Sequence, residues 1–457
     1  MIKKYRYIIK NMMAGAMTVM FLTACGQTAI TNPTGTDTAG TDIAATESAA
    51  TDTAATETGE ESVSPEEIEK NDTEDLITHH NDHKYTHGTD GYYNLLEDGV
   101  EFELVPQLSG TCWLCSAACA MMTDYQLFHD GKITLEQYDL LNRIYDDDKE
   151  EGVFVRKGAE KEKIGGLGIF VVNELSLGFN DGLVLDGAIS AKDWTDEEIK
   201  EGIKKYGALY IGITDSNKGT YDNYHTMNFP NAKPEEYDHS IAILGWDDHF
   251  PKENFMIKAS KDGAWIAYNS NYPYEYFYIS YDTTIDKIND PPLFMSASEE
   301  YSRVLFHDRG VWTEEPVITG EKTTTANVFK EKGTLYAVGT YTFSDDEDIN
   351  IQIMTADMKE CLYSMDCHVD YAGYHVFKLE EPQEVEEYAV AVTYPLGAPV
   401  EGDSIDVDFS IYIKVVSDKG QSFILIDDEW LDMSEKSTWD RLGRVTNNAC
   451  IRALYSE

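Results

Sequence analysis

The stretch SGTCWLCSA, residues 109–117, places Cys112 directly after a Gly-Thr turn and at the start of a run that favours helix. The N-terminus of a helix stabilises a thiolate, because its N–H groups carry partial positive charge. Cys115 and Cys119 follow on the same predicted helix. This stretch alone leaves four interpretations open: a catalytic nucleophile, a Cys-x-x-Cys redox pair, a metal site and plain helix packing.

Two downstream stretches supply partners for a thiol nucleophile. YDHSIAILGWDD places His239 at the start of an apolar strand, and GAWIAYNSN offers Asn269 on a following strand. An imidazole can accept the proton of a thiol, and an amide oxygen can hold that imidazole in the required tautomer. The order Cys112, His239, Asn269 therefore predicts a nucleophile, a base and an orienting amide, and it favours catalysis over a redox pair.

These motifs together resemble the papain-like cysteine peptidases over residues 100–285. GTCW is similar to the nucleophile motif of that family, DHSIAILGWDD to its histidine strand, GAWIAYNS to its asparagine strand and YFYISYD to the strand that closes its β-rich half. The resemblance implies an α+β, two-lobed peptidase domain with a helical lobe and an antiparallel β lobe. It also implies hydrolysis of protein or peptide substrates, with no cofactor and no metal.

The resemblance extends to the substrate-binding residues, with departures. Gly165 and Gly166 in IGGLGIF are similar to the glycine pair whose backbone binds the substrate. The family places a Gln six residues before the nucleophile, where this chain has Pro106. A one-residue deletion in QLSGT would let Gln107 complete the oxyanion hole. The Trp that follows Asn-Ser in the family is Asn271 here, which predicts slower catalysis, with Tyr272 as a partial cover.

The N-terminus has the layout of a bacterial lipoprotein signal. Basic residues in MIKKYRYIIK precede a short apolar stretch that ends in LTACG. We therefore expect a signal peptide over residues 1–25 and acylation of Cys25, with an ordinary cleaved signal peptide as the alternative. Residues 26–75, rich in Thr, Ala, Asp and Glu, are expected to be a disordered tether. The predicted location is the extracellular face of a bacterial membrane, with lipid as the anchor.

The charge of the chain argues against nucleic-acid partners, and a histidine-rich stretch leaves metal binding open. The formal net charge of −47 argues against nucleic-acid binding, because phosphates would be repelled. His79, His83 and His87 recur at four-residue spacing, which would suit a metal on one helix face. The alternative interpretation is an exposed polar linker.

The chain divides into two folded parts, which we expect at residues 76–312 and 318–457. The first shows two candidate capping boxes, Thr134-x-x-Gln137 and Thr195-x-x-Glu198, and then strand-like runs that include ALYIGIT, NFMIKAS and EYFYISY. The second reads as strands throughout, without a convincing helical period, which predicts an all-β sandwich. ANVFKEKGTLYAVGTYTF resembles the opening of a lectin-like domain, which implies a carbohydrate or cell-surface ligand.

The other cysteines are expected to have structural roles, and two alternative functions stay open. Cys115 and Cys119 are expected to be packing residues, and Cys450 to be unpaired. Cys361 and Cys367 flank a predicted turn and are candidates for a disulfide outside the cell. A surface binding protein with an inactive peptidase fold would explain the shifted Gln107. A cell-wall hydrolase of the Cys-His-polar kind is the other alternative.

Overall fold

The computed structural model describes residues 88, 90–101, 106–129, 131–178, 183–214, 226–270, 276–310, 316–407 and 410–456. The predicted signal peptide, the predicted tether and His79, His83 and His87 lie outside these residues. None of the helices formed by the described residues has the length and hydropathy needed to cross a membrane.

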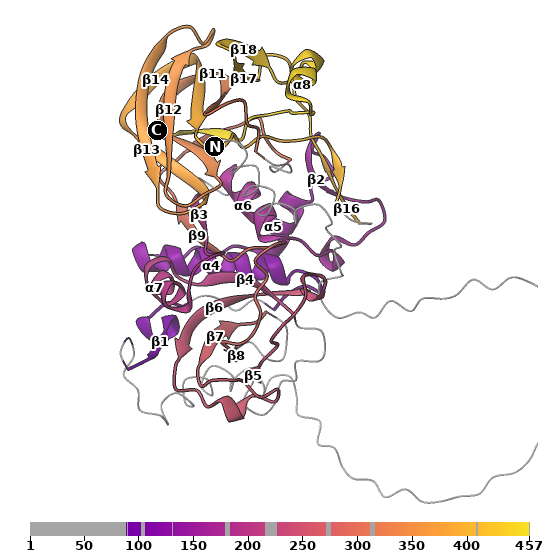
Figure 1. Ribbon diagram of the computed structural model, residues 1–457, viewed down its shortest axis with the longest axis vertical. Helices are drawn as coiled ribbons and strands as arrows, with labels where there is room; N and C mark the ends of the chain where they lie inside the picture. Colours follow the sequence, from indigo (N-terminus) through magenta and orange to yellow (C-terminus); the bar gives the residue numbers. More distant parts are fainter. Residues whose placement is uncertain are drawn as a thin grey trace, which may run out of the picture.

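Helix α4 (Cys112–Phe128) is the centre of the first domain. Every residue from Cys112 to Tyr125 is buried, which is why the run is apolar on all sides rather than on one face. On one side lie α5 (Gln137–Ile144) and α6 (Gly168–Ser176), and on the other lies the sheet that contains β4 (Leu209–Ile213) and β6 (His239–Asp247) (Figure 1). The helical and β lobes therefore meet along α4.

The β lobe is largely antiparallel. Its strand order is β3-β9-β4-β6-β7-β8-β5, and β5 pairs in parallel with β8. The strands not yet bounded are β3 (Val184–Ser190), β5 (Thr226–Met227), β7 (Ala264–Tyr268), β8 (Tyr276–Ser280) and β9 (Leu293–Ser298). Strand β1 (Tyr92–Asn94) adds to β6. Helix α7 (Asp196–Tyr206) begins with the Thr195–Glu198 capping box, as predicted.

One predicted strand of this lobe is wrong. The run NFMIKAS forms the end of a short 3-10 helix (Lys252–Asn254) followed by bends. Phe255 is buried, whereas Met256 and Ile257 are exposed, so the apolar run does not face one core. The Asn228 side chain donates to the carbonyl of Ile257 in place of a ladder partner.

The second domain is a β-sandwich built around two long strands, β11 (Thr323–Thr342) and β14 (Gly373–Tyr394). Their pairing shifts register between Lys330 and Gly333 and again between Leu335 and Ala337. Beyond these bulges the same two strands join different neighbours, which creates two layers with a core between them. One layer adds β12 (Glu347–Thr355), β13 (Cys361–Val369), β17 (Ser422–Ile426) and β18 (Glu429–Asp432), and the other adds β10 (Arg303–Leu305) and β19 (Ile451–Tyr455).

Two expectations for this domain are corrected by the structure. A short helix, α8 (Lys436–Leu442), lies where only strands were expected. Cys361 and Cys367 do not flank a turn but lie on the same strand, β13, and both are free. Six residues of strand span roughly 20 Å, at about 3.3 Å per residue, which is far beyond the Cα separation of a disulfide.

The two domains are joined by pairing between their strands and by contacts of a buried arginine. Strand β14 pairs with β3 of the first domain, and β16 (Ile411–Lys414) pairs with β15 (Ile405–Asp406) and with β2 (Gly152–Val155). Arg452 of β19 is fully buried, lies 3.0 Å from Asp308 and donates to Asn173 of α6 at 2.8 Å. The β-domain is therefore joined to the first domain by backbone pairing and by the buried hydrogen bond from Arg452 to Asn173.

Candidate active site

Cys112 is the first residue of helix α4, as the sequence predicts, and its side chain is buried. Thr111 occupies the N-cap position, but its side chain makes no capping hydrogen bond. Its hydroxyl instead lies 2.9 Å from Oε1 of Gln137 and 3.0 Å from the carbonyl of Leu108. The cap hydroxyl is thus used to hold the preceding loop rather than the amides at the start of the helix.

His239 and Asn269 form a buried pair. His239 is the first residue of β6, and Asn269 directly follows β7, the antiparallel neighbour of β6. Nε2 of His239 lies 2.8 Å from Oδ1 of Asn269, and the two residues are 4% and 0% exposed. Because an amide oxygen only accepts, the proton of a neutral imidazole lies on Nε2, and Nδ1 is left as the acceptor.

Packing of α4 on β6 brings the start of the helix and the start of the strand to the same region. Ser116, one turn after Cys112, donates from Oγ to the carbonyl of Ser240, the residue after His239, at 2.8 Å. Both serines are buried. The structure therefore places the two elements that begin with Cys112 and His239 against each other at their first turns.

A buried tyrosine–carboxyl pair, Tyr210 and Asp290, contacts Ser240. The Tyr210 hydroxyl donates to Oδ2 of Asp290 and lies 3.2 Å from Oγ of Ser240. Oδ1 of Asp290 accepts from the backbone N–H of Gly168, the first residue of α6. Burial raises the pKa of Asp290 to about 7. Burial and then the Asp290 charge also raise the pKa of Tyr210, and Cys112 is close enough to contribute.

Gln107 lies in the entry loop, which we define as residues 106–111, and Ser270 holds it. Its backbone N–H donates to the carbonyl of Ser270 at 2.8 Å, and Ser270 Oγ donates to its Oε1 at 3.0 Å. Its side-chain NH₂ donates to the carbonyl of Ser109. Ser270 follows Asn269 directly, so the same chain segment contacts both His239 and Gln107. In the sequence Ser270 is only part of the motif around Asn269, and nothing local indicates its contact with Gln107.

Gln137 also contacts the entry loop, a role that the sequence did not predict. The predicted Thr134-x-x-Gln137 capping box is wrong, because α5 begins after Glu136 and has no side-chain cap. Gln137 is buried and bonds to Pro106, Leu108 and Thr111. These contacts join segments far apart in the sequence, so no local pattern could have indicated them.

Gly166 is required by close packing. A Cβ at Gly166 would lie about 2.5 Å from the ring of Trp113, which is the residue after Cys112. Trp113 is fully buried and meets the rings of Tyr145 and Phe170 edge-on. The carbonyl of Gly165 accepts from the hydroxyl of Tyr145 at 2.8 Å. The predicted glycine pair therefore lies against the first turn of α4.

Some features expected around the site lie elsewhere or outside the described residues. Asn271 and Tyr272 are not among the residues that the structure describes. Within the described ranges, no cluster of His, Cys, Asp and Glu side chains could hold a metal ion.

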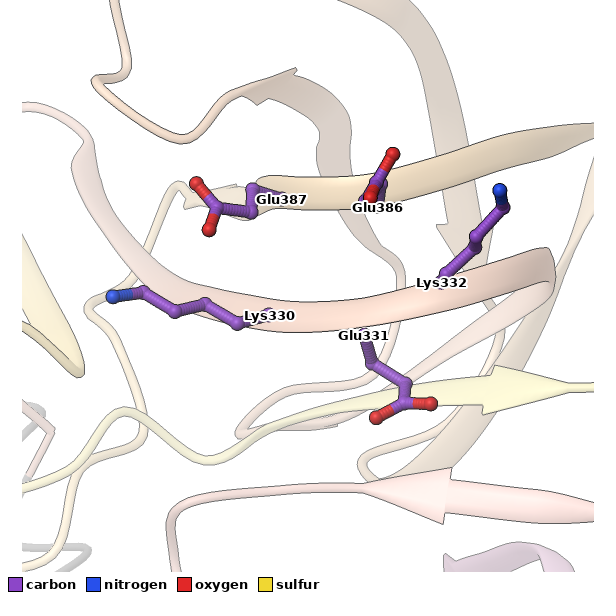
Figure 2. Close-up of a pocket in the computed structure, with 5 residues that line it drawn as sticks. All are labelled: Lys330, Glu331, Lys332, Glu386 and Glu387. Atoms are coloured by element: carbon purple, nitrogen blue, oxygen red, sulfur yellow. The ribbon is translucent and has the colours of Figure 1, made fainter.

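Two surface hollows lie on the β-domain. One, of about 510 Å³, lies at the β11/β14 bulge. It is lined by five charged residues, of which Lys332 and Glu386 extend to the same side of the two strands (Figure 2). The other measures about 370 Å³ and is lined by Lys322, Asp348, Ile349, Asn350, Asp366, Cys367, His368, Thr393 and Pro395. Neither contains a predicted catalytic residue.

Comparisons with known proteins agree with this architecture. Residues 305–455 match the family described as "Lectin like domain". The chain is similar in structure to the clostridial cysteine protease Cwp84 after propeptide cleavage, with a TM-score of 0.63 and 19% identity, covering 79% of this chain and 98% of that one. A second structure, of the cysteine protease and lectin-like domains of Cwp84, described as a surface layer associated protein of Clostridium difficile, gives a TM-score of 0.62 and 18% identity and covers 81% of this chain and 89% of that one.

No curated protein matches the chain. The fold is thus α+β, a two-lobed domain with the fold seen in the Cwp84 structures, followed by a β-domain that matches the lectin-like family model.

Proposed function

We propose that this protein is a cysteine endopeptidase that hydrolyses peptide bonds through Cys112, His239 and Asn269. The observation that carries the proposal is the buried 2.8 Å contact between His239 Nε2 and Asn269 Oδ1. A satisfied core histidine would explain the contact alone. It would not explain why the strand that His239 begins is packed against the first turn of the helix that Cys112 begins.

The mechanism assigns one step to each group. The Cys112 thiolate attacks the peptide carbonyl carbon, and the new C–S bond leaves an oxyanion bound by the Cys112 N–H and Gln107. The C–N bond then breaks as the His239 imidazolium gives its proton to the leaving amine. Water next attacks the thioester, with its proton passing to His239, and the C–S bond breaks to release the acid. Asn269 keeps the His239 ring oriented throughout.

The substrate approaches in an extended conformation alongside Gly165 and Gly166. Neither residue carries a side chain that would keep another backbone at a distance. Pairing of the substrate with this segment would resemble the addition of a strand. Trp113 fixes the position of Gly166 from the side of α4.

Labelling with an epoxide-type thiol probe tests the proposal. We expect the wild type to be labelled at Cys112 and to cleave unstructured peptides, and Cys112→Ala to lose both properties. Cys115→Ala, one turn along the same helix, should keep most of both. A folded wild type that neither takes the label nor cleaves would contradict the proposal and favour a surface binding protein.

The redox and cell-wall alternatives have their own readouts in the same experiment. Equal loss in Cys112→Ala and Cys115→Ala, together with disulfide-reductase activity in the wild type, would indicate a redox pair. Cleavage of peptidoglycan fragments without cleavage of ordinary peptides would indicate a cell-wall hydrolase.

The β-domain is assigned a carbohydrate or other cell-surface ligand, and Cys25 is assigned acylation. The family match over residues 305–455 supports the first assignment. The 370 Å³ hollow is the candidate site, because the Asn350 amide donates to Asp366 there and so holds the carboxylate in place as an acceptor for sugar hydroxyls. Asn350→Ala should weaken binding on a glycan array, and unchanged binding would exclude this hollow. Only the N-terminal sequence supports the lipid anchor. The proposed domain boundaries are residues 76–312 for the peptidase domain and residues 318–457 for the β-domain.

A further inference from the structure

We infer that Gln137 is a positioning residue for catalysis, whose side-chain amide fixes the entry loop so that Gln107 and the Cys112 N–H can bind an oxyanion. The inference rests on the proposed function, because it concerns the same site. It adds a residue from α5, a helix that carries none of the predicted catalytic groups.

The amide of Gln137 contacts the entry loop at both of its ends. Nε2 donates to the carbonyl of Pro106 at 2.8 Å. Oε1 accepts from the N–H of Leu108 at 3.0 Å and lies 2.9 Å from Oγ1 of Thr111. Pro106 and Leu108 are the two neighbours of Gln107, and Thr111 directly precedes Cys112. One side chain therefore holds the backbone on both sides of Gln107 and the hydroxyl of the residue before Cys112.

The entry loop is held from the opposite side by the β lobe. Ser270 accepts from the backbone N–H of Gln107 and donates to its Oε1. Gln107 is thus fixed between Ser270 of the β lobe and the loop that Gln137 of the helical lobe anchors. Besides the Gln137 contacts, the entry loop is held by Ser270 and by the N–H of Gly110, which donates to the carbonyl of Glu162 at 2.8 Å.

The conformation of the loop explains why it needs an anchor. Ser109 has a φ of 48°, in the left-handed region that non-glycine residues rarely adopt. Such a conformation costs free energy and persists only where the surroundings enforce it. A neutral amide suits the task, because Pro106 requires a donor whereas Leu108 and Thr111 require an acceptor. An apolar side chain would satisfy neither.

Two reactions of Cys112 separate positioning from general damage. Peptide hydrolysis passes through an oxyanion, whereas alkylation of the thiolate by iodoacetamide displaces iodide at a saturated carbon and forms no oxyanion. We expect Gln137→Met, which is similar in volume but cannot hydrogen bond, to lower kcat for a small peptide amide about tenfold or more. KM and the rate of Cys112 alkylation should each change by less than about threefold. The loss is smaller than the hundredfold to thousandfold typical of a direct oxyanion donor, since Gln137 acts through others.

A matched control exists on α4. Gln126 also bonds the N–H and the carbonyl of one loop residue, Glu101, through its side-chain amide. It lies in the second half of the helix, away from Cys112. Gln126→Leu removes the same kind of amide–backbone pair and should leave kcat and the alkylation rate unchanged.

A double-mutant cycle gives the strictest test. If Gln137 acts by placing Gln107, the variant Gln107→Ala/Gln137→Met should lose little more activity than Gln107→Ala alone. Fully multiplicative losses would overturn the inference, as would an unchanged kcat in Gln137→Met or parallel losses of hydrolysis and alkylation. If Gln137→Met does not fold, Thr111→Val removes one of the same contacts, and it must show the same split between hydrolysis and alkylation. A wild type that is alkylated but hydrolyses no peptide would instead refute the proposed function itself.

Discussion

Nε2 of His239 lies 2.8 Å from Oδ1 of Asn269, and both residues are buried at the ends of adjacent antiparallel strands. Loss of this acceptor would free the His239 ring to rotate and to adopt the other tautomer. We expect Asn269→Ala to lower kcat on the order of a hundredfold, toward the lower end of what general acid–base catalysis contributes. Steady-state kinetics on a peptide amide measures this, and Asn269→Gln should recover little because the longer side chain misplaces its oxygen. A loss below threefold would argue that His239 is oriented by other contacts.

The contact between Ser270 and Gln107 yields a graded prediction. Gln107→Ala removes a proposed oxyanion donor, and the expected loss of turnover is on the order of a hundredfold to a thousandfold. Ser270→Ala removes only the hydroxyl that holds Gln107 and should cost less, because the Ser270 carbonyl still accepts from the Gln107 backbone. Turnover of Gln107→Ala within a few-fold of wild type would show that the shifted Gln107 does not fill the role.

The buried Arg452–Asp308 pair predicts a large effect on stability. Arg452→Met would leave the buried Asp308 carboxyl without its ion-pair partner, which typically costs about 3–5 kcal/mol. The midpoint of the first urea transition should therefore fall markedly. Arg441→Met removes partly exposed ion pairs to Asp427 and Glu429, and its expected cost is below about 1 kcal/mol. Similar midpoints for the two variants would contradict this account.

Asp290 predicts how stability changes with pH. Burial raises the pKa of Asp290 to about 7, so its favourable contribution is complete below the unfolded pKa of the carboxyl and is lost as pH rises through 7. Asp290→Asn should therefore gain stability relative to the wild type as pH rises from about 4 to about 7, so its advantage should be larger at pH 8 than at pH 5. At about 1.4 kcal/mol per unit of pKa difference, the gain is on the order of a few kcal/mol.

Urea denaturation at the two pH values measures this gain. Asp193→Asn, at an exposed position, is the matched control and should change neither value. A wild-type advantage at pH 8 would show that the Asp290 carboxyl is stabilised as the charged form.

Cys25→Ser tests the lipid anchor. If LTACG is a lipoprotein signal, the wild type should incorporate a labelled fatty acid and fractionate with the membrane, and the variant should do neither. Acylation is the reason, because acyl chains provide the membrane affinity. Unlabelled wild-type protein recovered from the growth medium would exclude the anchor.

Local signals account for what the sequence predicted well. A helix that begins at Cys112, a strand that begins at His239 and the capping box at Thr195 each depend on a few adjacent residues. The two-domain α+β fold followed from the order of such segments and from the resemblance of their motifs. Errors in the predicted ends of single helices or strands change neither the order of the segments nor the motifs.

Contacts between distant segments account for what it missed. Gln137 resembled part of a capping box, because nothing nearby indicates that its amide contacts Pro106. Cys361 and Cys367 resembled a bridged turn because the sequence does not show that β13 runs through both. Gly166 was assigned to substrate binding, and its close approach to Trp113 could not be read from spacing.

The pairing of β14 with β3 and of β16 with β2 has a consequence for how the proposed peptidase would meet its targets. Backbone ladders at these two joints connect the domains directly. A ligand that holds the β-domain on a cell surface would also orient the proposed active site of the first domain. Which targets are cleaved would then depend on where they lie relative to that ligand, as well as on their amino-acid sequence.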